Sequence, residues 1–267
     1  MGESDLQTQI AAARAYEAFF VPALFGEWAP RVAKLAGIRT GEHLLDVACG
    51  TGVLAREAAS QAGPSGFVAG VDASPGMLAV AKAVAPRIEW REAKAEALPF
   101  PDQRFDAVVS QFGLMFFTDR RRALSEMLRV LKRGGRLVVA VWASLESAPA
   151  YAAEVALLER LAGKPTAAAL RAPFVLGDTK ELKELVASAG VDKVTITTQR
   201  GVARFPSIRF MVEADLRGWL PLMGVVLTED HMSRILLEAE HGLGAYVTAT
   251  GTTACEIAAH LVTGTRS

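Results

Sequence analysis

Two acids and a pair of glycines are spaced so that they could hold a charged small molecule. Asp46 ends a short apolar run, Gly50 and Gly52 follow it, and Asp72 ends the next apolar run. Glycines accept positive φ and let a ligand approach the backbone without a Cβ in the way. An acid about twenty residues beyond such a turn is suited to a ribose diol. This spacing indicates a site for a ligand that contains a nucleoside.

Two classes of ligand fit this spacing. The pattern Gly50-x-Gly52-x-x-Ala55 also matches a dinucleotide fingerprint, in which the turn binds a pyrophosphate. Asp46 favours the other class, because a carboxylate beside the turn repels a pyrophosphate but attracts an ammonium group or its water shell. The alternative is a structural Asp46 that only bonds to its own turn.

The elements that must position these residues alternate between strand and helix from residue 41 to residue 142. This alternation is typical of a parallel sheet with right-handed crossovers. We expect strands at 43–47, 66–72, 87–91, 105–110 and 137–142. We expect one helix to begin after Thr51 as its cap, and a second after Ser74 as its cap with Pro75 in the first turn. A third helix is expected at 119–131, ended by Arg133, Gly134 and Gly135.

The flanking segments are predicted as helices and a few strands. Helices are expected at 6–21, ended or kinked by Pro22, at 28–36, stopped by Gly37, and at 147–161, 179–189, 207–220 and 228–241. Thr179 is the expected cap of its helix, and 163–177 is expected to be a loop or a broken helix. Strands are expected at 191–198 and at 257–263. Residues 200–205 are expected either to pair with the strand at 191–198 or to continue the edge of the sheet.

The chain resembles the class I S-adenosylmethionine-dependent methyltransferases, and within them the branch of the ubiquinone/menaquinone C-methyltransferases. The motifs that carry the likeness occur in order at 44–52, 70–78, 95–102, 105–110 and 129–137. The resemblance implies an α/β, Rossmann-like fold: a seven-stranded, mostly parallel sheet with helices on both faces, whose last strand is antiparallel. It also implies an enzyme that uses S-adenosylmethionine to methylate a small, largely apolar acceptor by in-line displacement.

The resemblance also implies a division of the chain. Residues 1–40 would form an N-terminal helical lid and 41–142 the cofactor-binding core. Residues 143–176 and 207–250 would form an inserted lid over the substrate, and 177–206 with 251–267 the remainder of the sheet domain.

The family's binding residues carry over onto matching positions. Asp72 would bind the ribose diol, Gly50 and Gly52 would line the path of the methionine and ribose, and Asp46 would support the amino acid end. The rest of the implied cofactor site comprises Tyr16 at the methionine end, Ala48, Ala73, Met77 beside the adenine, Ala95 and Glu96 flanking it, and Gln111 near the methyl group. Ala48 stands where the family commonly has Gly, and Lys94 stands where it usually has Asp, so adenine contacts would pass to Ala95 and Glu96.

No catalytic base follows from the resemblance. Gln111, with Phe112, is a candidate for positioning the reacting pair, and His231 and His241 could face the pocket from lid helices. His43 and His260 are interpreted as structural. A base matters for a hydroxyl or activated carbon acceptor, whereas exclusion of water and in-line positioning can act without one. No spacing typical of a metal site is present in the sequence, so we expect no metal.

Composition restricts the partners. The 267 residues carry a formal net charge of zero, so we expect no nucleic-acid partner. Only two cysteines are present, which predicts a cytoplasmic protein without a disulfide framework. No apolar run reaches the roughly 18 residues of a membrane span, so none is expected. Oligomeric state cannot be read from these patterns. Two alternatives stay open: the same fold could bind the cofactor for a non-methylating reaction such as cyclisation, or the chain could be a nicotinamide-dependent oxidoreductase. The second lacks a Tyr-x-x-x-Lys pair to donate a proton.

Overall fold

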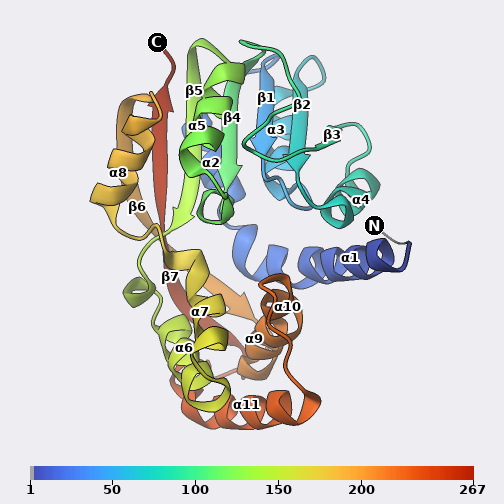
Figure 1. Cartoon of the computed structure of the whole chain (residues 1–267), viewed down its shortest axis with the longest axis vertical. Coiled ribbons are helices and arrows are strands. Elements are labelled where there is room, and N and C mark those ends of the chain that lie inside the picture. The colour runs from blue at the N-terminus through green and yellow to red at the C-terminus, as the bar shows by residue number, and fades with distance from the viewer. Residues whose placement is uncertain (1–2) are drawn as a thin grey trace.

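The computed structural model describes residues 3–267, and a seven-stranded sheet of order β3-β2-β1-β4-β5-β7-β6 runs through it (Figure 1). Five neighbouring strands are parallel: β1 (His43–Val47), β2 (Phe67–Asp72), β3 (Glu89–Glu92), β4 (Phe105–Gln111) and β5 (Leu131–Trp142). β7 (Thr253–Thr265) is antiparallel to both β5 and β6 (Asp192–Phe205). The mostly parallel sheet with an antiparallel last strand is thus confirmed.

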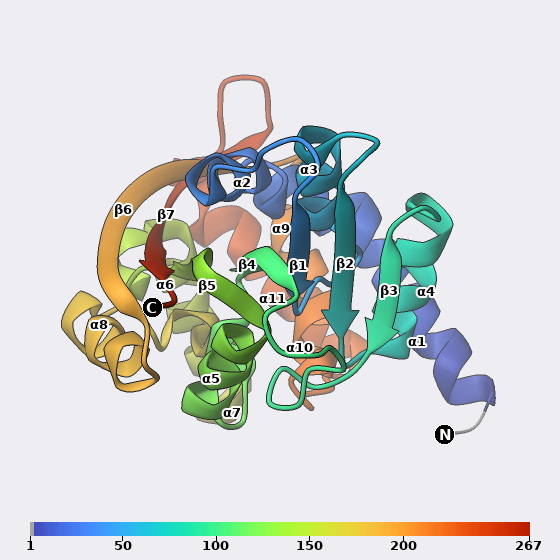
Figure 2. The ribbon, with the colours of Figure 1, turned by 90° about the horizontal axis from the view of Figure 1, so that it is seen from above.

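Helices cover both faces of this sheet. Figure 2 shows α2 (Ala29–Ala36) and α3 (Val53–Ala62) on one face, and α5 (Arg120–Val130) and α8 (Thr179–Ser188) on the other. α4 (Pro75–Val84) packs beside β3. The central strands are buried on both sides, as Leu44, Leu45 and Val108 are fully inaccessible. Strands that are buried on both faces consist of continuous apolar runs, and these runs allow the strands to be predicted from the sequence.

Helix ends follow the predicted chemistry at two positions and depart from it at two others. Ser74 caps α4 by accepting the N–H of Met77, and Gly37 ends α2 in the left-handed region. Thr51 does not cap α3, which begins after Gly52 without a side-chain cap. The cap of α8 is Asp178, whose carboxylate accepts two backbone N–H groups, so Thr179 is already the first helical residue.

The double glycine after α5 lies inside a strand, and the prediction that it ends the helix is wrong. α5 stops at Val130, and β5 begins at Leu131. The register between β4 and β5 shifts from Phe105↔Leu131 to Ala107↔Arg136, so the extra residues of β5 form a bulge that contains Gly134 at φ 71°. Glycine relieves the strain of such a bulge because it accepts positive φ.

The N-terminal helix extends beyond Pro22. α1 (Glu3–Ala15) continues into the wider π-helical segment η1 (Tyr16–Phe25), which contains the proline. The wider turn tolerates the missing N–H, and Gly26 donates to the carbonyl of Val21 at its end. α1 crosses α4 closely, since a Cβ on Gly76 would lie 2.6 Å from the backbone of Gln9.

A second group of helices lies beyond the carboxyl edge of the sheet (Figure 1). This helical layer consists of α6 (Pro149–Ala162), α7 (Lys164–Arg171), α9 (Ile208–Ala214), η5 (Asp215–Trp219), α10 (Leu220–Leu222) and α11 (Glu229–Gly242). Single 3₁₀ turns occur at η2 (Leu114–Phe116), η3 (Leu145–Ser147), η4 (Ala172–Phe174) and η6 (Gly244–Tyr246). The broken helix expected at 163–177 is confirmed as α7 with η4.

One long ribbon joins the sheet to the helical layer. β6 is a single strand, not two separate pieces, and it pairs with β7 without interruption from Thr195 to Phe205. Gly201 has to lie at its position in β6 because a Cβ there would come within 2.6 Å of the buried Trp28 ring. Among the described residues, none of the helices has the length and apolar character to cross a membrane.

Candidate active site

Four parallel strands bring their last residues to one edge of the sheet. Asp46 lies near the end of β1, and Asp72, Gln111 and Trp142 end β2, β4 and β5. Ligands of open α/β sheets bind at this carboxyl edge. It faces the helical layer, with η1 between the two parts (Figure 1).

Asp46 is a buried carboxylate without a partner. It is 2% exposed, and neither of its carboxylate oxygens has a hydrogen-bond partner within residues 3–267. Burial raises its pKa well above the usual range; the N–H of Ala55, in the first turn of α3, opposes the shift, and the charge of Asp72 adds to it. That N–H does not make a hydrogen bond of normal geometry with the carboxylate. An unpaired buried carboxylate favours a cationic ligand.

Asp72 holds the glycine turn and the next helix together. Its Oδ2 accepts the N–H of Gly50 and its Oδ1 accepts the N–H of Ser74, both at 2.8 Å. Burial raises its pKa, and these two N–H groups lower it. Each oxygen keeps a second lone pair for a further hydrogen bond. Of the residues that follow, Ala73 is exposed and Met77 is half-buried.

The two glycines of the turn have different roles. Both have positive φ, 54° at Gly50 and 89° at Gly52. A Cβ on Gly52 would lie 2.3 Å from the Trp90 ring, so its missing side chain makes room for that indole. A Cβ on Gly50 would meet only the Tyr16 ring, at 3.8 Å. Ala48 also has positive φ, 58°, a conformation that glycine adopts more readily than alanine.

Tyr16 lies between the glycine turn and a large cavity. Its ring stacks on Phe25 with 5.2 Å between centroids, and its hydroxyl lies near Gly50. Burial, together with the nearby charge of Asp72, raises its pKa, so the phenol is neutral at physiological pH. The structure therefore brings Tyr16 to the residues with which it was predicted to act.

Gln111 connects the end of β4 to the N-terminal segment. Its Nε2 donates to the carbonyl of Phe25 at 3.1 Å, while its buried Oε1 has no partner among the described residues. Phe112, at φ 57°, stacks on Trp142 with 3.7 Å between centroids and 10° between planes. These contacts place a polar amide and a flat aromatic pair side by side at the edge of the sheet.

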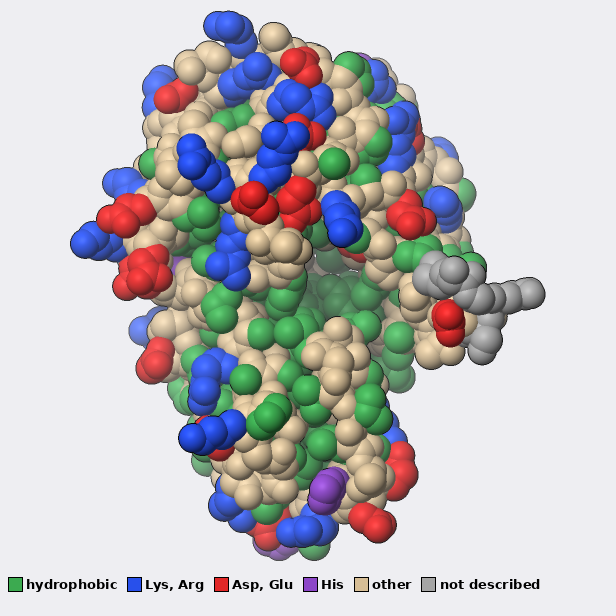
Figure 3. Space-filling view, in the orientation of Figure 1, with side chains coloured by type: hydrophobic (Ala, Val, Ile, Leu, Met, Phe, Trp, Pro, Cys, Tyr) green, Lys and Arg blue, Asp and Glu red, His purple; other side chains and the backbone are tan. Residues whose placement is uncertain are grey.

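The cavity next to Tyr16 has a free volume of about 720 Å³, including the part open to solvent. Its walls are mostly aromatic and aliphatic, with rings from Tyr16, Phe20, Phe25, Phe112, Trp142 and Phe174. Figure 3 shows a hollow lined by hydrophobic side chains at the waist of the molecule, between the sheet and the helical layer. Asp215 is the one ionisable carboxyl group among the lining residues, and the Tyr151 side chain adds a hydroxyl to the same lining.

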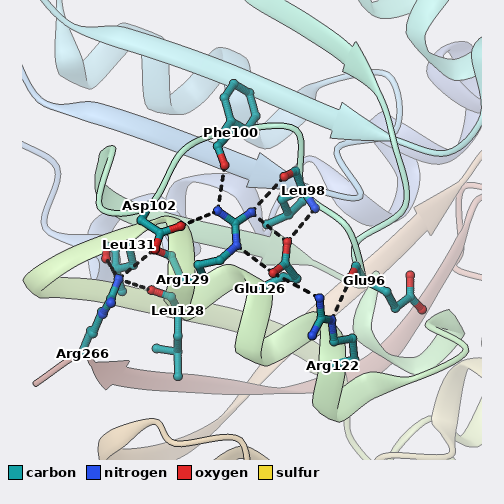
Figure 4. A network of polar contacts seen from close by, with 10 residues as sticks. All are labelled: Glu96, Leu98, Phe100, Asp102, Arg122, Glu126, Leu128, Arg129, Leu131 and Arg266. Carbon is teal, nitrogen blue, oxygen red and sulfur yellow. Dashed lines mark hydrogen bonds and ion pairs between the residues drawn. The ribbon is translucent and has the colours of Figure 1, made fainter.

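The predicted adenine loop is held by α5 (Figure 4). The Arg129 guanidinium donates to both Glu126 oxygens, to Asp102 and to the carbonyls of Leu98 and Phe100. Glu126 in turn accepts the N–H of Leu98, so one helix fixes the loop by side-chain and backbone contacts.

The residues of that loop face different directions. Ala95 is buried, Lys94 is exposed, and the Glu96 carboxylate accepts the N–H of Asp119 at 3.2 Å. The Glu96 carbonyl also accepts from Arg122. One carboxylate oxygen of Glu96 is thus engaged at the start of α5.

The histidines do not contribute to the cavity. His231 and His241 are exposed on α11 and do not line the cavity, so the expectation that they could face it is wrong. His260 is buried between the Thr198 hydroxyl and the carbonyl of Gly177, a structural position as predicted. His43 begins β1, where its N–H donates to Asp106.

Three functional candidates were missed in the sequence: Tyr151, Glu154 and Asp215. All three are buried, with 4%, 0% and 3% of their surface exposed. Glu154 follows Tyr151 by three residues and therefore lies on the apolar face of α6. An acidic residue on the apolar face of a helix, here Glu154 on α6, was the one sequence feature that could have indicated this buried cluster.

Known proteins share both the sequence and the fold. Residues 45–139 match the methyltransferase domain family. The ubiquinone/menaquinone biosynthesis C-methyltransferase of Pseudomonas paraeruginosa is 36% identical over 190 residues, which cover 65% of this chain and 74% of that protein. Its counterpart in Ectopseudomonas mendocina is 46% identical over 118 residues, 42% of this chain and 46% of the relative.

Solved structures show the same fold at low sequence identity. A putative methyltransferase from an antibiotic biosynthesis pathway of Anabaena variabilis has a TM-score of 0.66 at 19% identity, covering 90% of this chain and 96% of that one. Phosphoethanolamine N-methyltransferase 2 of Haemonchus contortus, in complex with S-adenosyl-L-methionine, has a TM-score of 0.60 at 19% identity, covering 96% of this chain and 57% of that one.

Fold, site and relatives together define a class I S-adenosylmethionine-dependent methyltransferase. Within that class, the chain belongs to the family of the ubiquinone/menaquinone C-methyltransferases, which it resembles in sequence. It is an enzyme that uses S-adenosylmethionine to methylate a small molecule.

Proposed function

We propose that the acceptor is a small, flat and largely apolar ring system, such as the quinol of a ubiquinone or menaquinone precursor. The supporting observation is the aromatic cavity that begins beside Gln111 and Phe112. Its stacked Phe112 and Trp142 rings offer a planar wall at the edge where the cofactor binds. The names of the relatives supply the quinone class.

The residues at the sheet edge fit S-adenosylmethionine. The unpaired Asp46 carboxylate suits the ammonium group of its amino acid end, and the free lone pairs of Asp72 suit the two ribose hydroxyls. We assign Gly50, Ala48 and Tyr16 to the methionine path, and Ala73, Met77 and the backbone of Ala95 and Glu96 to the adenosine. Gly52 supports this site indirectly, through its contact with Trp90.

The cofactor supplies an electrophilic methyl group on a sulfonium. The chain positions the acceptor against it: Gln111 and Phe112 lie at the reacting end, and Tyr16 with η1 covers the site from solvent. Orientation and exclusion of water lower the barrier to displacement at a sulfonium, because charge disperses as the methyl group moves. We assign residues 1–40 and the helical layer within 143–176 and 207–250 to the lid that provides this enclosure.

A transfer assay with radiolabelled S-adenosylmethionine tests this function. The acceptors are 1,4-dihydroxynaphthalene, as a flat apolar ring, and phosphoethanolamine, as a polar amine. We expect label only in the naphthalene product, and loss of cofactor binding in Asp72→Ala but not in Asp230→Ala, an exposed acid of α11. Equal methylation of the amine, or unchanged cofactor binding in Asp72→Ala, would contradict the proposal.

A further inference from the structure

A polar cluster is buried where the apolar cavity meets the helical layer. It consists of Glu154 on α6, Asp215 at the start of η5, and Tyr151 one turn before Glu154. Both Glu154 oxygens, Asp215 Oδ2 and the Tyr151 hydroxyl have no hydrogen-bond partner in the structure of residues 3–267. No described Lys, Arg or His forms an ion pair or a hydrogen bond with either carboxylate. The cluster therefore has hydrogen-bonding capacity that the protein itself does not use.

The two buried carboxyl groups interact electrostatically, and both keep their protons to a higher pH than usual, Asp215 with a pKa of about 8. Burial raises the pKa of both groups, and the charge of Asp215 raises that of Glu154 further. Burial, with the charges of the same two groups adding to it, raises the pKa of the neighbouring Tyr151 phenol and Cys255 thiol, so both of these stay neutral. Two buried carboxylates without a cation cannot both be ionised, and such a pair can accept one proton and release it again.

Only one of the two carboxyl groups faces the cavity. Asp215 and Tyr151 line it, whereas Glu154 is not among the lining residues. The same cavity reaches Tyr16 and Phe112, which adjoin the glycine turn and Gln111. A molecule that fills it would touch Asp215 at one side and lie against the cofactor edge at the other.

We propose that Asp215, supported from behind by Glu154, binds a hydroxyl group of the acceptor and takes its proton during methyl transfer. This inference rests on the proposed function, because it assumes that the acceptor occupies the aromatic cavity. Tyr151, which lines the cavity beside Asp215, is placed to hydrogen-bond the same hydroxyl oxygen.

The proton and electron balance is simple. The acceptor hydroxyl gives its proton to an Asp215 oxygen, and the electron pair of the O–H bond stays on the acceptor. The acceptor uses an electron pair to form the bond to the methyl carbon, while the carbon–sulfur bond breaks and its pair remains on sulfur. Where the new bond is to a ring carbon, the hydrogen on that carbon leaves as a proton to water, and the product oxygen takes up one proton from water, so that one proton is released overall. The proton on the carboxyl pair returns to solvent when the product leaves.

Binding of two matched ligands tests the hydrogen bond. We would titrate the protein, saturated with S-adenosylhomocysteine, with 1-naphthol and with 1-methoxynaphthalene, which cannot donate a proton. A hydrogen bond to a charged group favours the donor by roughly tenfold to a hundredfold. We expect that preference in the wild type, a reduced one in Asp215→Asn, and none in Asp215→Leu. Glu154→Gln should keep it, because Asp215 still faces the ligand.

The outcomes separate the two proposals. If both ligands bind equally to the wild type, or if Asp215→Leu keeps the preference, the role of Asp215 is refuted while the apolar cavity stands. If neither ligand binds although S-adenosylhomocysteine does, the proposed acceptor site is refuted together with this role. Retained S-adenosylhomocysteine affinity shows that each variant is folded.

Transfer rates test the proton step. With 1,4-dihydroxynaphthalene as acceptor, we expect kcat of Asp215→Leu to fall by roughly 10²-fold or more, with little change in the KM for S-adenosylmethionine. Burial raises the pKa of Asp215 to about 8, so the wild-type kcat should fall as the pH drops below about 8 and Asp215 becomes protonated. This limb should be absent in Asp215→Leu. An unchanged kcat in the variant would refute the proton step, whereas no transfer in the wild type would refute the proposed function on which this step rests.

Discussion

Replacing Asp46 by Asn should have opposite effects on stability and on cofactor binding. The change keeps the shape of the side chain and removes its charge. Burial raises the pKa of Asp46 in the folded protein, so over a range of pH the folded chain keeps a proton that the unfolded chain has lost. Stability therefore falls as pH rises from the unfolded pKa, about 3.9, toward the folded pKa.

The magnitude follows from linkage. Within that range, a single carboxyl of this kind lowers the free energy of unfolding by about 1.4 kcal/mol per pH unit. Asn does not titrate, so the stability of the variant relative to wild type should grow by that amount per unit above pH 4. Loss of the charged partner of an ammonium group should weaken S-adenosylmethionine binding by roughly 10-fold to 100-fold.

Urea unfolding of the cofactor-free protein between pH 5 and pH 8 measures the first effect, and calorimetric titration measures the second. Asp230→Asn, at an exposed position, is the matched control and should change neither. If Asp46→Asn is less stable than wild type across this range and binds the cofactor normally, Asp46 is a structural turn residue and the assignment to the cofactor is wrong.

Three further predictions concern the support of the site. Gly52→Ala should destabilise the fold by about 2 kcal/mol or more, because the residue has positive φ and its Cβ would meet Trp90. Gly50→Ala should cost about 1 kcal/mol, because only the positive φ opposes it. The urea midpoints of the two variants measure this difference in stability. Asp72→Ala should weaken S-adenosylmethionine binding at least tenfold in a calorimetric titration, since the ribose loses its acceptor and Gly50 its anchor. Arg129→Met should reduce the acid sensitivity of the fold, because the hydrogen bonds from Arg129 lower the pKa of Glu126. Wild-type stability is therefore lost as pH falls through that lowered pKa. Unfolding followed from pH 6 to pH 3 should show a smaller loss in the variant.

The sequence was sufficient for features that depend on a few neighbouring residues. Asp46 and Asp72 were placed correctly at the ends of their strands, because an apolar run followed by a glycine turn is a local pattern. The Ser74 cap and the Gly37 helix end were predictable for the same reason. Their structure is decided within one or two turns of chain.

Features that depend on distant contacts were not predictable. Nothing near Gly52 in the sequence indicates that Trp90 occupies the space beside it. Asp215 and Glu154 are separated by about sixty residues, and their meeting depends on how the helical layer folds against the sheet. The histidines of α11 have a helical spacing that leaves the direction of the face undetermined, and the packing of the helix turns them outward.

The continuous ribbon of β6 and β7 has a consequence for how substrates enter. Backbone hydrogen bonds join the two strands without a break from the sheet into the helical layer, so this connection cannot act as a hinge. Swinging the helical layer away would require part of that ladder to be broken. The N-terminal segment is joined to the rest of the fold by side-chain contacts: Gln111 donates to the carbonyl of Phe25, Arg56 of α3 pairs with Glu17, and α1 packs against α4. Because such contacts can be remade without breaking a backbone ladder, we expect α1 and η1, and not the helical layer, to move when substrates enter.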